Sequence, residues 1–171
     1  AASTILNITV DALIIPTFAA IANVCQGSAA PVIPTTSTNG INGTWAPAVS
    51  TATAGTTTYT FTPTAGQCAA NATLNITVDA APTITNPTLT QSICTGTAAT
   101  FAPTASIAGS TFAWTATASS ASVSGYAASG TGNINNVIIN SGTTVETVTY
   151  FITPTGPGSS ICPGVPANFV V

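Results

Sequence analysis

Apolar residues alternate with threonine or asparagine along several short segments of the chain. A period of two residues is the pattern of strands that bury one face, because successive side chains of a strand point to opposite sides. No segment shows the 3.6-residue periodicity of an amphipathic helix. We therefore predict an all-β fold, whose strands contain these inward-facing residues: Tyr59, Phe61, Leu74, Ile76, Val78, Phe112 and Trp114.

Glycine and proline interrupt the alternating segments at short intervals. The pairs Asn39-Gly40 and Asn42-Gly43 predict tight turns, because these residues tolerate the left-handed backbone that hairpin turns need. Threonine is frequent between the apolar positions and suits the exposed face of a strand.

Residues 1–12 and 69–80 nearly repeat each other, and both end in Leu-Asn-Ile-Thr-Val-Asp-Ala. In the second copy this segment closes a module that begins near Leu13. The first copy therefore predicts an orphan strand, which either closes a preceding module or is donated to a neighbour. We expect two tandem β-sandwich modules after it, at residues 13–80 and 81–171.

The cysteines place both modules on one plan. Trp45 follows Cys25 by 20 residues, and Trp114 follows Cys94 by the same interval. Each of these cysteines opens a Cys-x-Gly-x-Ala pattern. Each tryptophan is followed by a Tyr-x-x-Thr-Pro segment and then by a second cysteine; the residues are Tyr59 and Cys68 in the first module and Tyr150 and Cys162 in the second.

The two modules differ between the tryptophan and the tyrosine. This interval is 14 residues in the first module and 36 in the second. The extra length includes the strand-like residues 133–139, so we predict an additional hairpin in the second module.

Four cysteines without basic neighbours favour structural disulfides over reactive thiols, and disulfides indicate an oxidising, extracellular compartment. Because each module contains one matched pair, we predict the bridges Cys25–Cys68 and Cys94–Cys162. A loop of this length contributes about 4 kcal/mol in the chain-entropy account. A Cys25–Cys94 bridge would contradict the two-module plan.

The 171 residues include no Lys, Arg or His, and the acids are Asp11, Asp79 and Glu146, giving a net charge of −3. General acid–base catalysis, phosphate binding and transition-metal binding all need residues that this composition lacks. Asp11 and Asp79 stand alone at module junctions, whereas calcium takes about six to eight oxygens. We expect a protein that is not an enzyme, with no cofactor, no metal and no nucleic-acid partner.

The hydrophobic fraction of 45% with only 2% charged residues is that of a folded chain. The longest clear apolar run, residues 12–15, is far shorter than the about 18 residues of a membrane span and stops at Pro16. We expect no membrane insertion. The chain shows no methionine and no basic segment before an apolar run, so any export signal is expected elsewhere.

The order cysteine, tryptophan, cysteine resembles an immunoglobulin-like sandwich, in which the tryptophan packs between the sheets. One departure is that Cys68 lies nine residues after Tyr59, beyond a turn, and not within the same strand. A Cys25–Cys68 bridge would therefore lie near one end of the module.

The segments GINGTWAPA (40–48) and AGTTTYTFTPTAGQC (54–68) resemble Ig-like repeats of very large secreted surface proteins of Bacteroidota. SICTG (92–96), FAWTA (112–116) and TYFITPTG (149–156) resemble PKD-like modules of the same proteins. This resemblance implies export, often by type IX secretion, and display as an adhesin, a gliding-type filament or another extracellular fibre.

The tryptophans can be interpreted either as core residues or as sugar-binding residues. Trp45 and Trp114 are typical of core packing because their spacing from cysteine is matched, although tryptophans also stack on sugars. Tyr59 and Tyr150 are likewise expected in the core. The asparagine-rich residues 133–140 are expected to form an exposed strand face; binding of glycans through their amides is the alternative.

We therefore predict a non-catalytic structural repeat of a cell-surface fibre or adhesin stalk; the alternative is a carbohydrate-binding module of a surface-attached protein, with surface glycans as partners. Sheet edges without lysine are poorly protected against pairing. The expected partners are neighbouring modules or identical subunits, arranged head to tail, with Ala1 to Val10 available for strand donation.

Overall fold

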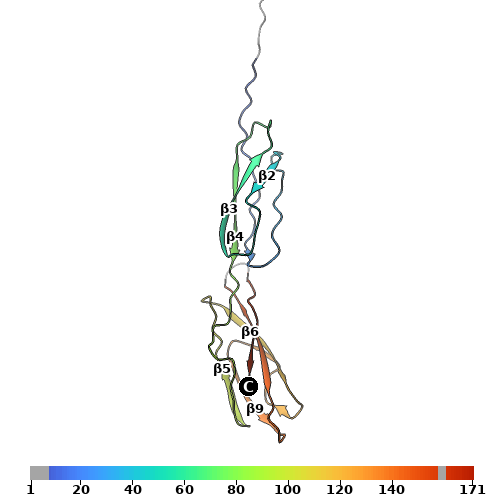
Figure 1. The fold of residues 1–171 in the computed structure, drawn as a ribbon, viewed down its shortest axis with the longest axis vertical. Helices are drawn as coiled ribbons and strands as arrows, with labels where there is room; N and C mark the ends of the chain where they lie inside the picture. The colour runs from blue at the N-terminus through green and yellow to red at the C-terminus, as the bar shows by residue number, and fades with distance from the viewer. Residues whose placement is uncertain (1–7, 158–160) are drawn as a thin grey trace, which may run out of the picture. The chain divides into compact units, whose positions relative to one another are not determined.

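The computed structural model describes residues 8–157 and 161–171, and these contain strands and no helix. The all-β prediction is therefore confirmed for this part of the chain. The chain divides into two compact units, unit 1 (Ala1–Val78) and unit 2 (Asp79–Val171), shown in Figure 1. Of the predicted orphan strand, residues 1–7 lie outside the described residues, and residues 8–12 form no strand.

Unit 1 contains one four-stranded sheet with the order β1-β4-β3-β2. Its long hairpin joins β3 to β4 in antiparallel register, so that Gly55 faces Val78 at one end and Phe61 faces Ala72 near the other. The predicted alternation lies on this hairpin, because Tyr59, Phe61 and Ile76 point inward and the threonines between them point outward. The strands of the sheet are β1 (Val24–Cys25), β2 (Gly43–Ala46), β3 (Gly55–Pro63) and β4 (Ala72–Asp79).

The core of unit 1 lies between this sheet and an irregular segment of the chain. Ile33, from that segment, packs with Tyr59 and Ile76, which are 8%, 2% and 1% exposed. Three prolines, at positions 16, 31 and 34, interrupt the segment, and proline cannot donate to a strand ladder. The described part of unit 1 therefore has a single sheet where the sequence predicts a two-sheet sandwich.

The two turns predicted around Asn39 and Asn42 have different outcomes. Gly40 adopts a φ of 86° and donates its N–H to the Ser37 carbonyl oxygen at 3.0 Å, as a tight turn requires. The prediction for Asn42-Gly43 is wrong, because Gly43 is the first residue of β2. A Cβ at Gly43 would overlap the ring of Phe61, so this glycine makes room for an aromatic side chain.

Unit 2 is a β-sandwich of two sheets. The larger sheet has the order β11-β10-β6-β8, and the smaller has the order β5-β9-β7. The strands are β5 (Thr97–Phe101), β6 (Thr111–Ala118), β7 (Val123–Ser124), β8 (Ser129–Thr131), β9 (Ile134–Asn140), β10 (Val148–Thr155) and β11 (Ala167–Val170).

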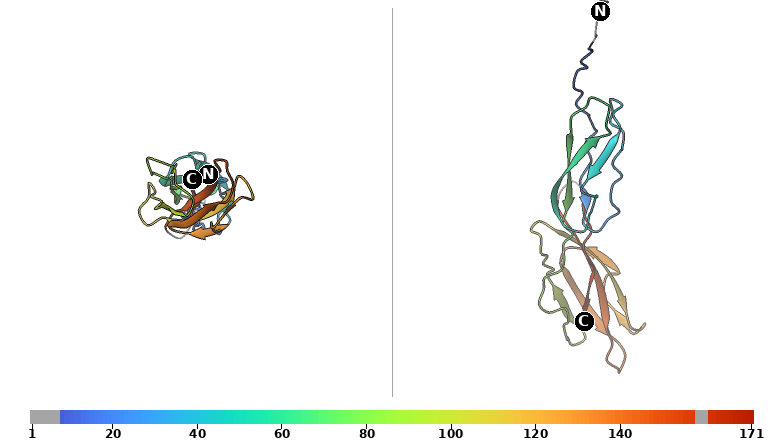
Figure 2. Two further views of the ribbon diagram at one scale, coloured as in Figure 1. Left: turned by 90° about the horizontal axis from the view of Figure 1, so that it is seen from below. Right: turned by 45° about the horizontal axis from the view of Figure 1, so that its top comes forward.

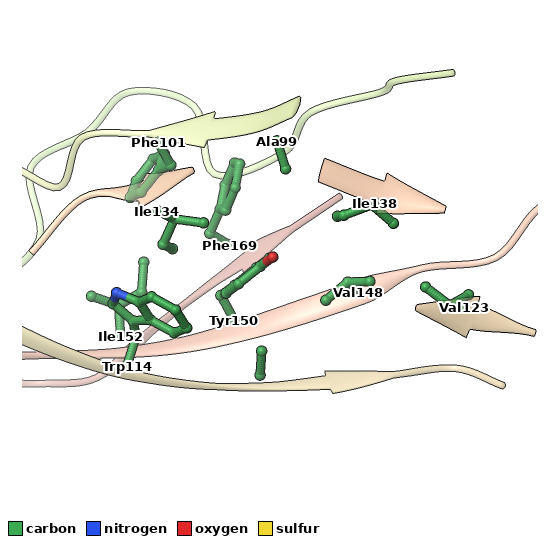
Figure 3. Packing of buried hydrophobic residues seen from close by; sticks show 11 residues of the cluster. Ala99, Phe101, Trp114, Val123, Ile134, Ile138, Val148, Tyr150, Ile152 and Phe169 are labelled. Carbon is green, nitrogen blue, oxygen red and sulfur yellow. The ribbon is translucent and has the colours of Figure 1, made fainter. Parts of the chain in front are cut away.

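Both sheets of unit 2 direct apolar side chains into the space between them (Figure 3). Phe101 from β5 stacks on Phe169 from β11, with ring centroids 4.2 Å apart. Trp114 from β6 meets Tyr150 from β10 edge to face at 5.5 Å. Aromatic contacts of this kind contribute beyond the area that they bury, so the larger core is well suited to hold two sheets together.

The additional hairpin predicted for unit 2 is not formed, because no two consecutive strands between β6 and β10 pair with each other. β9 includes residues 134–139 of the strand-like segment and pairs with both β5 and β7 in the smaller sheet. β8, which precedes β9 in the chain, pairs instead with β6 in the larger sheet. The insertion therefore widens both layers of the sandwich.

Candidate functional site: the cysteine-bearing ends of each unit

The chemistry available to the described residues is limited. They contain no group of three or more His, Cys, Asp or Glu side chains that could hold a metal ion. Among the same residues no helix has the length and apolar character needed to cross a membrane. The remaining candidates are the cysteines, the aromatic residues and a cleft in unit 2.

Cys25 opens a tight turn in unit 1. Its carbonyl oxygen accepts the N–H of Ser28 at 3.0 Å and the Ser28 hydroxyl at 2.7 Å. Gly27 has a φ of 77°, which explains the glycine of the Cys-x-Gly pattern. The Gly27 N–H binds the Thr51 carbonyl oxygen at 2.9 Å, so the turn lies beside the chain that leads into β3.

Cys94 opens the same turn in unit 2. Its carbonyl oxygen accepts the N–H of Thr97 at 3.1 Å and the Thr97 hydroxyl at 2.6 Å. Gly96 has a φ of 82° and donates to the Ile138 carbonyl oxygen at 2.8 Å. Cys25 and Cys94 are therefore structurally equivalent, and we call them the first cysteines of their units.

Cys68 and Cys162 are the second cysteines, and each follows the Thr-Pro end of the tyrosine-bearing strand. Cys68 lies in the turn between β3 and β4, and its carbonyl oxygen accepts the Ile14 N–H at 2.9 Å. Cys162 follows β10, and its carbonyl oxygen accepts the Gly156 N–H at 2.8 Å. In both units a residue with positive φ, Cys68 itself or Ile161, shapes this segment.

The first and second cysteines lie at opposite ends of each unit. In unit 1 the turn of Cys25 adjoins the start of β3, whereas Cys68 lies beyond the end of β3. In Figure 2 the short blue arrow of β1 and the green turn after β3 mark these two ends. Nine residues of strand span about 30 Å, whereas the Cα atoms of a disulfide lie about 4.4 to 6.8 Å apart.

The predicted bridges Cys25–Cys68 and Cys94–Cys162 are consequently wrong. Cys68 and Cys94 are free thiols on the surface. Cys25 and Cys162 are disulfide-bonded, and one bonded cysteine belongs to each unit. The matched spacing in the sequence reflects equivalent positions in two units and not pairing within one unit.

Both tryptophans pack against other aromatic rings. Trp45 is half-buried and packs against Phe18 and Phe61, with centroid distances of 4.6 and 5.1 Å, and its indole N–H donates to the Pro34 carbonyl oxygen at 2.8 Å. Trp114 is 6% exposed, and its Nε1 has no hydrogen-bond partner. Trp114 therefore has no exposed ring for sugar stacking, whereas Trp45 is partly exposed.

The tyrosines of the two units are buried at 2% exposure for Tyr59 and 0% for Tyr150. The Tyr150 hydroxyl donates to Asn136 Oδ1 at 2.9 Å. Burial, with a smaller effect of the neighbouring Tyr126, raises the pKa of Tyr150 to about 12. Tyr150 therefore stays neutral near pH 7 and acts as a hydrogen-bond donor inside the sandwich.

A cleft of about 590 Å³ opens at the first-cysteine end of unit 2. Cys94 lines it together with the apolar side chains of Val123, Ile138, Val148 and Val170. Its rim carries Glu146, whose carboxylate accepts the hydroxyls of Ser119 at 2.5 Å and Thr144 at 2.9 Å. These hydrogen bonds, that of Ser119 first, lower the pKa of Glu146.

The asparagines of residues 133–140 differ in exposure and in hydrogen bonding. Asn133 and Asn135 are exposed. Asn136 binds Tyr150, and Asn140 donates its amide to the Thr144 carbonyl oxygen at 2.8 Å. The sequence pattern predicts the exposed face, but it gives no signal for the two internal bonds or for the Ser119–Glu146 contact, because these depend on tertiary proximity.

Comparison with known proteins gives one match. Residues 91–171 match the family model described as a PKD-like domain. The predicted PKD-like character of residues 81–171 is thus confirmed over that range. No curated protein and no solved structure matches the chain.

Proposed function

We propose that this chain is a non-catalytic structural repeat segment of an extracellular cell-surface fibre or adhesin stalk. The observation that carries the proposal is the combination of a PKD-like domain at residues 91–171 with a second unit that uses the same cysteine turn. Such duplication suits a protein whose role is to extend and to bear load.

The chemistry of the chain supports a passive role. No Lys, Arg or His is present to act as a base or to bind an anion. The buried Tyr59, Tyr150 and Trp114 stabilise the two cores, and the half-buried Trp45 packs against the core of unit 1. A disulfide, which persists in oxidising compartments, favours a location outside the cell.

We infer the route of export and the site of display from a resemblance between sequence segments. The Trp45 and Trp114 segments resemble repeats of giant surface proteins of Bacteroidota, which are often exported by the type IX route. We propose the same route and the same display for this chain, as part of an adhesin or a gliding-type filament.

Neighbouring modules or identical subunits are the proposed partners, with Ala1 to Val10 as a donated strand. Ile8 and Val10 are 78% and 88% exposed, although both are apolar and β-branched, so pairing with a sheet edge would bury them. β2, at the edge of the unit 1 sheet, has no lysine to prevent such pairing.

Carbohydrate binding is the second candidate. Its support is the cleft of about 590 Å³, which threonines, Asn140 and Glu146 line with polar groups. No tryptophan, tyrosine or phenylalanine lines this cleft, so the stacking surface typical of a sugar site is missing from it. A glycan array with the purified chain tests this candidate, and saturable binding lost on Asn140→Ala would support it.

The structural role is tested on intact cells of the organism that produces the protein. An antibody raised against the chain should label unpermeabilised cells, and external protease should remove the label. Loss of the gene segment should shorten or remove surface fibres without loss of any enzymatic activity. Labelling only after permeabilisation would contradict the proposal.

A further inference from the structure

The oxidation states of the four cysteines form a pattern across the equivalent positions. Unit 1 has its first cysteine bonded and its second free, whereas unit 2 has its first cysteine free and its second bonded. The bonded set therefore contains one first cysteine and one second cysteine, and the free set contains the same combination.

We propose that Cys94 and Cys68 form a disulfide between two copies of this module pair, so that Cys94 of one copy joins Cys68 of the next. Each free thiol occupies a position at which the equivalent cysteine of the other unit is disulfide-bonded. We infer the disulfide between copies from this equivalence of positions and not from the exposure of either cysteine.

Both thiols are held by turns that are fixed before any partner arrives. At Cys94 the Asn140 N–H donates to the Thr95 hydroxyl oxygen at 2.9 Å. At Cys68 the side chain of Gln67 binds the Asn42 N–H at 2.8 Å and the Asn42 carbonyl oxygen at 2.7 Å. A preorganised thiol loses little conformational entropy when it is cross-linked.

The surroundings of the two thiols also differ in shape. Cys94 lines the cleft of about 590 Å³, whose walls include Val123 and Val148. Cys68 lies on an exposed turn that contains Ala65 and Gly66, small residues that allow close approach, and it lines a smaller and more open hollow of about 400 Å³. The proposed occupant of the mouth of the cleft is this turn from a second copy.

The chemistry is thiol–disulfide exchange with a low-molecular-weight disulfide such as oxidised glutathione. The Cys94 thiolate attacks one glutathione sulfur and expels the other as a thiolate, leaving a mixed disulfide. The Cys68 thiolate of the second copy then attacks the Cys94 sulfur and expels the second glutathione. Two protein thiols are oxidised, one glutathione disulfide is reduced, and the two protons pass to the glutathione thiolates.

The experiment incubates the purified chain with oxidised glutathione and follows it by non-reducing electrophoresis and peptide mapping. Wild-type protein should form a ladder of multimers. Cys68→Ser and Cys94→Ser should each fail to extend beyond a dimer. An equal mixture of the two variants should form a heterodimer in which the only new bridge joins Cys94 to Cys68.

A matched control separates position from exposure. Ser124 lies in β7 and is exposed, so the triple variant Cys68→Ser/Cys94→Ser/Ser124→Cys presents one surface thiol at another place. Its mixture with Cys94→Ser, which supplies Cys68, should cross-link about tenfold more slowly than the pair above, because docking raises the effective concentration only at Cys94. Equal rates, a Cys68–Cys94 bridge within one monomer, or no heterodimer would overturn the proposal.

The inference rests on the proposed function only for its oxidising compartment. If the purified protein formed the Cys94–Cys68 bridge but the antibody labelled only permeabilised cells, the inferred bridge would stand and the proposed surface role would be refuted. If the antibody labelled intact cells but the two variants formed no Cys94–Cys68 heterodimer, the surface role would stand and the inferred bridge would be refuted. The failure of one proposal can therefore be distinguished from the failure of the other.

Discussion

The hydroxyl of Tyr150 donates to Oδ1 of Asn136 at 2.9 Å, from β10 in the larger sheet of unit 2 to β9 in the smaller. The tyrosine is fully buried, and Figure 3 shows its hydroxyl directed from its own sheet toward the facing one. A buried hydroxyl without a partner would destabilise the fold, so Asn136 allows the tyrosine to sit between the layers.

The first prediction concerns alkaline pH. The pKa of Tyr150 is raised from 10 to about 12, so the folded state holds this proton more tightly than the unfolded state does. The stabilisation is therefore complete below pH 10 and should be lost as the pH rises from 10 to 12. Urea unfolding of unit 2, followed by Trp114 fluorescence in a Trp45→Phe background, should show this decline.

Tyr150→Phe is the matched variant for this prediction. It should be less stable than the parent near pH 7, because Asn136 loses its donor, by about 1 kcal/mol. Between pH 10 and 12 its stability should fall less steeply than that of the parent. Identical slopes for the two proteins would show that other groups cause the alkaline loss.

A second prediction concerns Gly130, which faces Trp114 across the β6–β8 pair. A Cβ at this position would lie 2.7 Å from Cη2 and 2.8 Å from Cε2 of the indole, too close for ordinary contact. Gly130→Ala should therefore destabilise unit 2 by about 1 to 3 kcal/mol, as overpacking does. Urea midpoints by Trp114 fluorescence, again with Trp45→Phe, provide the measurement.

Ser129→Ala is the control, because Ser129 is the exposed neighbour in the same strand. It should change the stability by less than about 0.5 kcal/mol. If both variants had the same stability, the indole would have room to move, and the close fit of Gly130 to Trp114 would be refuted.

Much of the fold is predictable from the sequence where one strand face is buried. Tyr59 and Phe61 in β3, and Leu74 and Ile76 in β4, are each separated by one polar residue. This spacing predicts the inward face, because the side chains of a strand point to the same side every second residue. The layer opposite the unit 1 sheet is not predictable in this way, since an irregular segment that contributes Ile33 has no period to detect.

The cysteines show why equal spacing can mislead. Cys25 and Cys68 recur with the tryptophan and tyrosine in the second unit, which correctly indicates a duplicated plan. Recurrence identifies equivalent positions, however, and carries no information on distance. The distance follows from β3, whose nine residues separate the two ends of the unit.

The third prediction concerns acid pH at Glu146. Hydrogen bonds from Ser119 and Thr144 lower the pKa of this carboxyl below 4.5. Its stabilising effect is therefore present above pH 4.5 and is lost as the pH falls through the lowered pKa. The Thr147 N–H donates to the Ser119 hydroxyl oxygen at 2.8 Å, so its hydrogen-exchange protection factor should fall at acid pH.

In Glu146→Gln the side chain cannot ionise, so the protection factor of Thr147 should start lower and vary little over the same pH range. Asp79→Asn serves as the comparison, since it removes a carboxylate from another part of the chain. If Glu146→Gln retained the acid dependence of the parent, that dependence would have to come from a different carboxyl group.

The last prediction is a thiol count on the native protein under non-reducing conditions. Cys68 and Cys94 are exposed thiols, whereas Cys25 and Cys162 are disulfide-bonded. A maleimide should therefore label the Cys68 and Cys94 peptides in the folded monomer, and label all four cysteine peptides only after reduction and unfolding. Mass spectrometry of the digested protein measures both states. An unlabelled native monomer whose digest contained Cys25 linked to Cys68 and Cys94 linked to Cys162 would restore the pairing that the sequence predicts. It would contradict the separation of Cys25 from Cys68 by the length of β3.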